Sequence, residues 1–491
     1  MRETFASAPS AAPAQAGLAA PAPLCVDLDG TLLRTDSLHE ALVSALRRAP
    51  WLLLALPFWL LRGRAPFKRE IARRAAIDPA LLPYDAGVLE LIRAERAKGR
   101  RIVLATAADA QLAEAIASHL GLFDEVLASD GVSNFKGERK AAALRQRFGE
   151  RGYDYVGDSR ADDAAWCSAG VAYVCSRGGP GPARRAEARG VRAVPIVRRP
   201  LLRFPLMRAL RPHQWVKNLL VFVPLVTAHR IHDDMAMRAS LLAFAAFSLA
   251  ASGAYVLNDL ADLDHDRRHP QKRARALAAG DLPLWAGALL APLLLALAFA
   301  LASPLQGRFV AELACYVVAT MAYSMWLKRL VLVDVFTLAG LYAIRILAGA
   351  AAIPVPVSHW LLVFSLFMFL SLALVKRYAE LSGLARRDAA KAPGRGYATG
   401  DRTVVGLMGV VCGQLSVLVF ALYITSPEIR VLYARPELLW VACPILLYWV
   451  ARVWLLAYRD ELHEDPLVFA LRDPASLALG VATLAVLAAA T

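Results

Sequence analysis

A cluster of acidic residues follows the apolar run from Ser240 to Leu257, in the segment Asn258-Asp259-Leu260-Ala261-Asp262-Leu263-Asp264-His265-Asp266. The run is long enough to cross a bilayer, and charged groups beside hydrocarbon are costly enough to indicate a function. Asp259, Asp262 and Asp266 are spaced i, i+3 and i+7, on one face of a continuing helix. Such oxygen ligands suit Mg²⁺, which bridges carboxylates to substrate phosphates. The segment therefore predicts a Mg²⁺ site at a membrane face, with a solvated acidic helix end as the alternative.

A second acidic pair lies near the start of the chain, in Asp27-Leu28-Asp29-Gly30-Thr31, directly after a short apolar run. A carboxylate at a strand end can attack phosphorus and form an aspartyl-phosphate. A carboxylate two residues later lies on the same side of the extended chain, where it can protonate a leaving alkoxide and then activate water. The pattern predicts phosphoryl transfer by Asp27 and Asp29, with an acid pair that caps a turn as the alternative.

Three further elements supply what phosphoryl transfer requires. Thr106 ends a second expected strand, where its hydroxyl can hydrogen-bond a phosphoryl oxygen. Lys136, in Asn134-Phe135-Lys136-Gly137-Glu138, can neutralise charge on the transferring group, and Lys140 is an open alternative. Asp158 follows another expected strand, in Gly157-Asp158-Ser159-Arg160-Ala161-Asp162-Asp163, and can complete a Mg²⁺ site.

In these four elements and their order, residues 24–180 resemble the haloacid dehalogenase (HAD) superfamily. The resemblance implies that Asp27 is the nucleophile, Asp29 the acid and base, and Thr106 and Lys136 the phosphate contacts. It also implies a set of Mg²⁺ ligands, which are Asp27, Asp29, Asp158 and Asp162, with Asp163 as the alternative to Asp162. Aspartate at position 29 favours a phosphatase. The helical segment 37–100 resembles the cap that shapes the substrate pocket in this superfamily.

An α/β sheet is expected to position the first set of residues. Short apolar runs at 24–28, 101–106, 153–157 and 171–175 predict strands, and helical patterns lie between them, as in a parallel sheet. The apolar stretch Trp51–Leu61 is too short to span a bilayer. We expect it to be a buried helix of the cap, with contact to a membrane surface as the alternative.

A membrane bundle is expected to position the second set. The chain has 491 residues, of which 58% are hydrophobic, and almost every long apolar run lies after Pro212. We expect an all-α polytopic bundle of about nine spans, at 215–228, 239–258, 283–302, 309–327, 331–352, 358–375, 403–424, 437–457 and 473–490. The predicted domains are a disordered leader (1–23), a HAD-like domain (24–183), a linker (184–207) and a transmembrane domain (208–491).

The net charge of +15 has a membrane explanation. Basic residues concentrate in loops 259–282 and 376–402, which by the positive-inside rule face the cytoplasm together with the N-terminal domain. We therefore expect a multi-pass protein of a bacterial inner (plasma) membrane. No aromatic-basic interleaving is present, so nucleic acid is not an expected partner. The six cysteines form no CxxC pair, which argues against a zinc site or a disulfide framework.

Three tracts of the second half resemble the UbiA superfamily of intramembrane prenyl-group enzymes, over residues 208 to 491. They are the acidic segment with its basic tail His265–Arg275, the tract Arg211-Pro212-His213-Gln214-Trp215-Val216-Lys217-Asn218, and Lys376-Arg377-Tyr378-Ala379-Glu380. The resemblance implies a helical bundle around a metal site that opens to lipid. Enzymes of this superfamily with a prenyl diphosphate donor usually carry a second Asp-rich motif after the sixth span. Here that loop is basic and has no acid pair, although it contains Asp388.

The basic loop and the tracts around it resemble the branch that makes polyprenyl-phosphoryl-phosphoribose, with one mismatch at Arg275-Ala276, where that branch often has Arg-Pro. The resemblance implies phosphoribosyl pyrophosphate as donor, polyprenyl phosphate as acceptor and Mg²⁺ as cofactor. The candidate substrate-binding residues are Lys217, Asn258, Arg267, Lys272, Arg273, Arg275, Lys328, Lys376 and Arg377.

The fusion predicts two reactions in series, because the product of such a transfer keeps a 5-phosphate that a phosphatase can remove. The result would be polyprenyl-phosphoryl-ribose, a pentose donor for cell-envelope glycans. Two other functions are open at this point. The chain could be a prenyltransferase that joins a prenyl diphosphate to an aromatic or lipid acceptor, or a transporter or lipid-binding scaffold with a degenerate HAD half.

Overall fold

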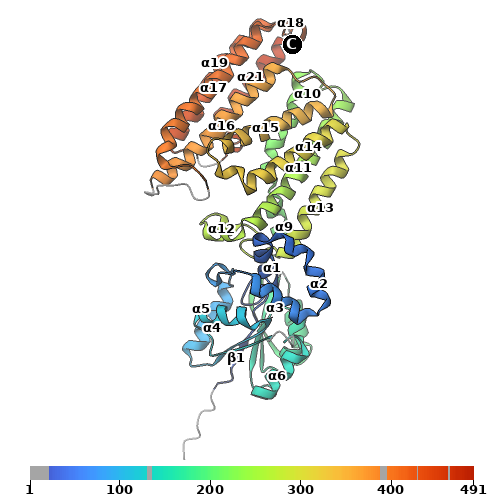
Figure 1. Cartoon of the computed structure of the whole chain (residues 1–491), viewed down its shortest axis with the longest axis vertical. Helices are drawn as coiled ribbons and strands as arrows, with labels where there is room; N and C mark the ends of the chain where they lie inside the picture. Colours follow the sequence, from blue (N-terminus) through green and yellow to red (C-terminus); the bar gives the residue numbers. More distant parts are fainter. Residues whose placement is uncertain (1–20, 130–134, 178, 387–394, 428, 463–464) are drawn as a thin grey trace, which may run out of the picture. The chain divides into compact units, whose positions relative to one another are not determined.

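The computed structural model describes residues 21–491 except 130–134, 178, 387–394, 428 and 463–464. The chain divides into two compact units. Unit 1 contains Met1–Leu202 with the segments Arg267–Ala274 and Ala278–Leu284, and unit 2 contains Arg203–Asp266, Arg275–Leu277 and Trp285–Thr491 (Figure 1).

Unit 1 is built on a parallel sheet, as expected for an α/β domain. Within the described part of the chain the sheet has six strands in the order β3-β2-β1-β4-β5-β6. The strands are β1 (Leu24–Val26), β2 (Ile102–Asp109), β3 (Glu125–Ser129), β4 (Asp154–Gly157), β5 (Val171–Arg177) and β6 (Arg192–Arg199). Helices α5 (Ala110–Leu120), α6 (Glu138–Phe148), α7 (Asp163–Cys167) and α8 (Gly181–Glu187) and the 3-10 turn η3 (Arg160–Asp162) connect them.

The linker expected at 184–207 is wrong in its central part. Residues Arg192–Arg199 form β6, which pairs in parallel with β5 at the sheet edge. The strand reads Arg-Ala-Val-Pro-Ile-Val-Arg-Arg, and its Val and Ile residues favour extended structure despite the basic residues. Pro195 is compatible with an edge strand, because one side of such a strand needs no N–H donor.

Alternation along the central strands builds a core on both faces of the sheet. Leu24 and Val26 of β1 pack with Leu104 of β2 in one cluster, whereas Cys25 and Val103 pack in the other. Because all strands run in parallel, their carboxyl ends share one edge. The strand order reverses between β1 and β4, which is where ligands bind in open α/β sheets. The ends of β1 and β4 carry Asp27 and Asp158.

The cap segment is helical, as expected, but one of its parts is not buried. It contains α1 (Ser37–Arg48), η1 (Pro50–Leu54), α2 (Leu56–Leu61), α3 (Arg64–Arg74), η2 (Pro79–Leu81) and α4 (Ala86–Ala97). The expectation that Trp51–Leu61 is a buried helix is wrong, because Leu54 is 77% exposed and Leu61 86%. Pro50 and Pro57 lie in the first turns of η1 and α2 and divide the stretch into two short pieces.

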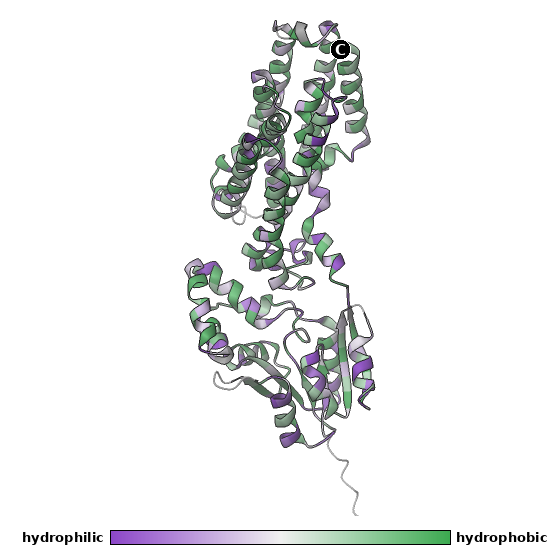
Figure 2. Cartoon of the chain, turned by 90° about the vertical axis from the view of Figure 1, so that its right-hand side faces the viewer, coloured by the Kyte–Doolittle hydropathy of each residue, from purple (hydrophilic) through white to green (hydrophobic). Residues whose placement is uncertain are grey.

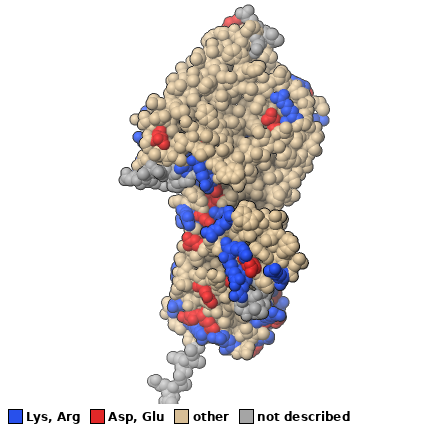
Figure 3. Space-filling model, in the orientation of Figure 1, with Lys and Arg blue, Asp and Glu red and all other residues tan. Residues whose placement is uncertain are grey.

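Unit 2 is helical and apolar along most of its helices (Figure 2). Among the described residues, six helices are long and apolar enough to cross a membrane. These are α11 (Asp234–Ala261), α13 (Leu284–Ala302), α15 (Val333–Ala352), α16 (His359–Ala385), α17 (Arg402–Thr425, with the preceding turn η7, Thr399–Asp401) and α19 (Ala442–Tyr458, with η8, Pro436–Val441). The visible surface of this unit is almost free of charged side chains (Figure 3).

The expected number of nine spans is not confirmed. Helix α14 (Gly307–Met325) carries Arg308 and Glu312 and is not among the six, and α21 (Pro474–Ala490) is shorter than a full span. Apart from the segment that begins at Pro212, the other helical pieces described after β6 are α9 (Arg203–Leu210), α12 (Leu263–Arg268), η5 (Lys272–Ala274), η6 (Leu327–Arg329), α18 (Ile429–Leu432) and α20 (Pro466–Ala470).

The span expected at 215–228 is replaced by a tighter structure. It folds as a 3-10 helix, η4 (Pro212–Phe222), followed by the short helix α10 (Val223–Thr227) with Pro224 in its first turn. Segment η4 packs closely on α15, since a Cβ added to Gly349 would lie 2.1 Å from the carbonyl oxygen of Val221. Small residues permit such close approach of backbones in membrane bundles. This contact brings the polar part of η4 against the middle of the bundle.

Candidate active sites

The carboxylates at the sheet edge of unit 1 surround one buried lysine. Lys140 of α6 donates to Asp27 Oδ1 at 2.6 Å and to the hydroxyl of Tyr155 at 2.8 Å, and its ammonium lies 3.6 Å from Asp162 Oδ1. Tyr155 in turn donates to Asp162 at 3.0 Å. Lys140 therefore stabilises a site that would otherwise bring like charges together in a dry environment.

These acids include a set that can hold a metal ion. In the described residues, ligand oxygens of Asp27, Asp158 and Asp162 lie within 4.8 Å of one another. Asp162 is fixed by backbone N–H groups of Asp158 and Ser159, at 3.2 and 3.1 Å. Three closely spaced carboxylates suit a hard divalent cation such as Mg²⁺. Of the two alternatives, Asp162 belongs to the set, whereas Asp163 forms ion pairs with Arg185 and Arg189.

Asp29 lies beside this set without belonging to it. Its Oδ1 accepts from the backbone N–H of Ser37 at 2.7 Å. Burial, with a contribution from Asp36, raises the pKa of the Asp29 carboxyl to about 6, and the Ser37 hydrogen bond opposes this rise. Burial also raises the pKa of Asp27 well above its usual range, although Lys140 partly opposes the effect. A carboxyl with a raised pKa is suited to donate a proton near neutral pH.

Position 140, and not position 136, supplies the lysine that contacts the nucleophile candidate. Lys136 is exposed, whereas Lys140 is 3% exposed and bonded to Asp27. Thr106 is fully buried, and its hydroxyl accepts from the N–H of Ala108 at 3.0 Å. Asn134 of the expected motif lies outside the described residues.

The cap contributes a basic residue that sequence reasoning missed. Lys68 of α3 donates to the carbonyl of Ala107, at the end of β2, at 2.7 Å. Burial lowers the pKa of Lys68, while nearby Asp29 and Asp36 oppose the shift. Lys68 thus lies close enough to the acid and base candidate to interact with it electrostatically. The basic residues of the cap segment are a sequence feature that could have pointed to it.

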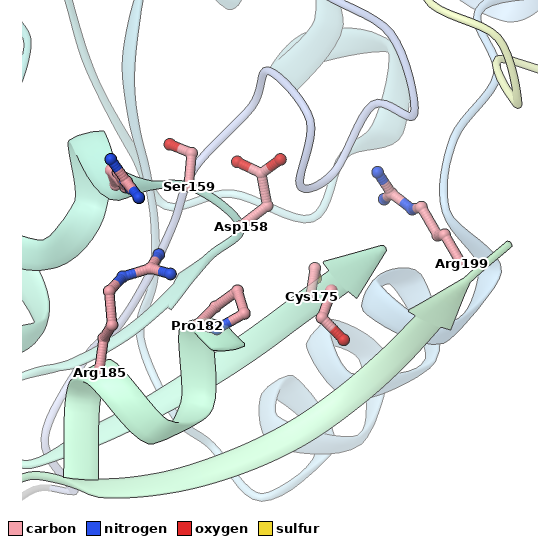
Figure 4. Close-up of a pocket in the computed structure, with 8 residues that line it drawn as sticks. Asp158, Ser159, Cys175, Pro182, Arg185 and Arg199 are labelled. Carbon is pink, nitrogen blue, oxygen red and sulfur yellow. The ribbon is translucent and has the colours of Figure 1, made fainter. Parts of the chain in front are cut away.

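A cavity of about 260 Å³ adjoins Asp158 (Figure 4). Its lining includes three arginines, one from η3, one from α8 and one from β6, which are Arg160, Arg185 and Arg199. Arg199 is held by Asp85 and by the carbonyls of Gly30 and Thr31. The cavity therefore places guanidinium groups next to the candidate metal ligands, although Arg185 and Arg199 already pair with Asp163 and Asp85.

The aspartates of unit 2 are held by basic side chains. Arg211, at the start of η4, donates to both carboxylate oxygens of Asp259 at 2.5 Å. One nitrogen of Arg275 lies 3.1 Å from Asp259 and 2.7 Å from Asp266. Because both carboxylates converge on this single nitrogen, the space between them fits a cation. This observation supports Asp259 and Asp266 as a pair of candidate metal ligands.

Asp262 is separate from this pair. It caps the C-terminus of α11, so that the expected continuous helix is interrupted before α12 begins at Leu263. Its carboxylate accepts from Lys328 at 2.8 Å and is 29% exposed. The three aspartates therefore do not lie on one face of a continuing helix, since Asp259 belongs to α11, Asp262 is its C-cap and Asp266 belongs to α12. Of the three, Asp259 and Asp266 share a partner, Arg275.

A second cluster of unit 2 is basic and converges on Asp465, a residue that sequence reasoning missed. Lys217 of η4 and Lys376 of α16 donate to Asp465 Oδ2 at 2.7 and 3.0 Å. Burial alone would raise the pKa of Asp465, but the two ammonium groups lower it below its usual range. The Asp-Pro dipeptide at 465–466 predicts a helix N-cap, but not these partners.

Arg345, in the middle of α15, adds a third positive charge near this cluster. It donates to the side-chain oxygen of Asn218 at 2.9 Å and to the hydroxyl of Tyr316 at 3.2 Å. Among the described residues, no carboxylate lies within 4.0 Å of its guanidinium. Both Arg345 and Lys217 lie over the ring of Tyr342, at 5.7 and 5.9 Å. A buried intramembrane arginine with only neutral partners is a candidate anion site.

The other predicted substrate-binding residues lie apart from these two clusters. Arg267, Lys272 and Arg273 belong to unit 1, where Arg267 pairs with Glu40. Arg377 is fully buried and pairs with Asp334 and Glu380. Asn258 is half-buried on α11. Asp388, in the loop after α16, lies outside the described residues.

Comparisons with known proteins agree with both halves of the fold. Residues 219–480 match the model of the UbiA prenyltransferase family, and residues 24–165 match that of haloacid dehalogenase-like hydrolases. The chain is 39% identical to protein y4nM of Sinorhizobium fredii, over 93% of this chain and 89% of that protein. It is 38% identical to the decaprenyl-phosphate phosphoribosyltransferase of Mycolicibacterium smegmatis, over 38% of this chain and 59% of that enzyme.

A solved UbiA homolog from Archaeoglobus fulgidus, described as bound to GPP and Mg²⁺, matches 57% of this chain and 99% of its own, with 16% identity and a TM-score of 0.46. The family match covers more than half of the chain and coincides with the apolar helices of unit 2. The chain therefore belongs to the UbiA prenyltransferase family, as a multi-pass membrane protein that carries a haloacid dehalogenase-like domain ahead of its membrane helices.

Proposed function

We propose that the chain is a bifunctional enzyme that transfers 5-phosphoribose from phosphoribosyl pyrophosphate to polyprenyl phosphate and then removes the 5-phosphate. The observation that carries the transfer is the separation of charge in unit 2. Asp259 and Asp266 form an acidic site, and Lys217, Lys376 and Arg345 form a basic site. A donor diphosphate needs a metal site, whereas a second phosphorylated substrate without a metal needs basic side chains.

Segment η4 connects the two sites. Arg211 contacts Asp259 at its start, and Lys217 contacts Asp465 six residues later. Six residues of 3-10 helix at a rise of about 2.0 Å span roughly 12 Å. The guanidinium of Arg211 also lies over the ring of Tyr255, 5.0 Å from its centroid, at the acidic end of η4. This spacing supports a donor and an acceptor held side by side.

The transfer step is a substitution at the anomeric carbon of the donor. An acceptor phosphate oxygen forms a bond to that carbon while the bond to the diphosphate breaks. The acceptor is already an anion, so the step needs no strong base. Mg²⁺ held by Asp259 and Asp266 would neutralise charge on the leaving diphosphate. Lys217, Lys376 and Arg345 orient the acceptor phosphate.

The second reaction is assigned to unit 1. Asp27 attacks the phosphorus of the 5-phosphate, the bond to the ribose oxygen breaks, and Asp29 donates a proton to that oxygen. Water, deprotonated by Asp29, then hydrolyses the aspartyl-phosphate. Lys140 compensates charge at Asp27, and the Mg²⁺ bound by Asp27, Asp158 and Asp162 would supply further compensation. The arginine-lined cavity beside Asp158 supports a substrate with a second phosphate group.

Location and orientation follow from the same proposal. Phosphoribosyl pyrophosphate is a water-soluble donor, so the acidic end of α11 and the HAD domain would face the cytoplasm of a bacterial plasma membrane. The basic residues of the two large loops support this orientation.

A donor competition tests the proposal. Membranes that contain the full chain are incubated with labelled phosphoribosyl pyrophosphate or with a labelled prenyl diphosphate. The amount of label in the lipid fraction is then measured. Label from phosphoribosyl pyrophosphate alone should enter lipid in the presence of polyprenyl phosphate. Label from the prenyl diphosphate alone would overturn the proposal in favour of a prenyltransferase, and label from neither would contradict both.

A second experiment tests whether the two halves act in series. Mass spectrometry of the lipid product should detect polyprenyl-phosphoryl-ribose in the wild type and its 5-phosphorylated precursor in Asp27→Asn. The variant Glu125→Gln is the matched control, because Glu125 lies at the start of β3, away from the site, and pairs with the exposed Arg101 and Arg147. If no precursor accumulates in Asp27→Asn, the HAD domain acts on another substrate.

A further inference from the structure

The cap of unit 1 exposes six large apolar side chains along η1 and α2. Trp51 is 69% exposed, Leu54 77% and Leu61 86%. The other members of this apolar patch are Leu53, Phe58 and Leu60. All six lie within eleven consecutive residues, and such clustering of exposed aromatic and aliphatic groups marks an interaction surface.

Basic residues border the apolar patch on both sides along the chain. Arg47 and Arg48 end α1, Arg62 follows α2, and Arg69, Arg73 and Arg74 lie on α3. All six are exposed. Between positions 47 and 74 the sequence holds eight basic residues and a single acid, Glu70, which pairs with Arg73 and Arg74. The basic border therefore keeps a strong positive charge.

The local structure holds the apolar and basic groups next to one another. Helix α2 packs on α3, and the guanidinium of Arg74 lies 4.6 Å from the ring centroid of Trp59. Short apolar helices with Trp, Phe and Leu on one side and Arg or Lys beside them lie in the interface of a bilayer. Their basic residues are attracted by anionic lipid headgroups.

We propose that η1 and α2 dock the cap onto the anionic surface of the bilayer that unit 2 spans. The charge pattern favours a lipid surface over a second copy of the chain, since two copies joined through this patch would bring two basic borders together. Unit 2 places the chain permanently at a membrane, so that the docking is intramolecular in effect and needs little intrinsic affinity.

Docking would also place the phosphatase site at the level of lipid headgroups. Helix α3 carries both part of the basic border and Lys68, which lies near Asp29. A lipid-linked phosphomonoester could then reach Asp27 without leaving the membrane. This consequence rests on the proposed function, whereas the docking itself does not.

Hydrogen–deuterium exchange of the full chain in lipid nanodiscs tests the docking. Backbone amides of residues 50–61 should exchange at least tenfold more slowly in nanodiscs with phosphatidylglycerol than in nanodiscs of phosphatidylcholine alone or in detergent. Strands β1 and β2 serve as internal references, because their exchange should not depend on the lipid. Equal exchange in all three environments would overturn the proposal.

Two sets of variants separate lipid docking from other causes of protection. Leu54→Glu with Leu61→Glu, and Arg48→Glu with Arg62→Glu, should each abolish the slowing, while Arg145→Glu with Arg192→Glu, elsewhere on unit 1, should leave it intact. All six side chains are exposed, so these changes spare the core. Protection that persists in detergent and grows with protein concentration would instead identify a second copy of the chain as the partner and overturn the proposal.

This readout is independent of the enzymatic assignments. Failure of the donor competition would leave the exchange result unaffected, and loss of docking would leave the transfer reaction in unit 2 intact. If the proposed function also holds, the docking variants should raise the KM for the lipid-linked substrate at least fivefold and change release of phosphate from a soluble phosphomonoester less than twofold.

Discussion

The two acidic sites of this chain handle their negative charge differently. In unit 1, Asp27, Asp158 and Asp162 lie together around one lysine, with Asp162 fixed by backbone N–H groups. In unit 2, the aspartates are held in ion pairs by Arg211, Arg275 and Lys328, and no comparable set of ligand atoms is found among the described residues there. The first site is organised before any ligand arrives, whereas the second must exchange ion pairs within the protein for contacts with a ligand.

The difference agrees with the two proposed reactions. Attack by a protein carboxylate requires fixed geometry, because the nucleophile is part of the scaffold. Transfer between two bound substrates requires that charged side chains release one another when the substrates enter. The following substitutions test this contrast, in order of decreasing expected effect.

Asp27→Asn should abolish the reaction of unit 1 and spare that of unit 2. Loss of a covalent nucleophile is expected to reduce phosphate release from a soluble phosphomonoester on the order of 10⁴-fold or more. Entry of label from the donor into lipid should stay within about twofold of the wild type, because Asp27 takes no part in transfer. Phosphate release near the wild-type rate would remove Asp27 from the mechanism.

Asp259→Asn combined with Asp266→Asn should have the opposite selectivity. We expect transfer into lipid to fall on the order of 10²- to 10³-fold, since charge stabilisation at the leaving group is lost. The concentration of Mg²⁺ for half-maximal transfer should also rise, while phosphate release by unit 1 is unchanged. Asp264→Asn, on α12, is the control. A double variant that keeps full transfer and the same Mg²⁺ dependence would disprove the acidic site.

Asp465→Asn tests whether the basic cluster is positioned for the acceptor. Without this carboxylate, Lys217 and Lys376 repel each other and lose their common contact. The KM for polyprenyl phosphate should increase about tenfold, equivalent to about 1.4 kcal/mol, with kcat changed much less. Asp465→Glu should restore part of the affinity. A fall in kcat at unchanged KM would indicate that Asp465 has only a structural role.

Lys136→Ala should have the smallest effect and thereby distinguishes Lys136, which precedes α6, from Lys140 on α6. Lys136 is exposed, so phosphate release should change by no more than about twofold, as is usual for surface substitutions. Lys140→Ala should be far more damaging, because removal of one partner from a buried ion pair costs about 3–5 kcal/mol. Thermal unfolding of both variants, measured beside activity, checks this order, and a reversed order would restore Lys136 as the phosphate contact.

Several elements of unit 1 could be predicted from local sequence. The strands that contain Val26, Thr106 and Gly157 are apolar and lie between turn residues and helical patterns. Strands β3 and β6 do not follow from the sequence pattern, because β3 is only half-buried and contains Glu125, and β6 carries arginines typical of a linker. In the membrane half, hydropathy located the helices, but it did not distinguish a spanning helix from the 3-10 segment η4.

The exposed stretch of the cap could not be predicted for a related reason. An apolar stretch such as Trp51–Leu61 is equally compatible with burial in a protein core and with exposure to lipid, since both environments are non-polar. Burial in the core and exposure at the surface are distinguished only by whether another element covers the stretch, and among the described residues none does.

The sequence alone determined which carboxylates could do chemistry, because strand ends of a parallel sheet share one edge and a short spacing on a helix keeps acids together. Only the tertiary structure decided their partners. Lys140 rather than Lys136 reaches Asp27, and Asp465 gathers lysines that precede it by 248 and 89 residues. Spacing restricts neighbours within one element, whereas contacts between distant elements depend on how those elements pack.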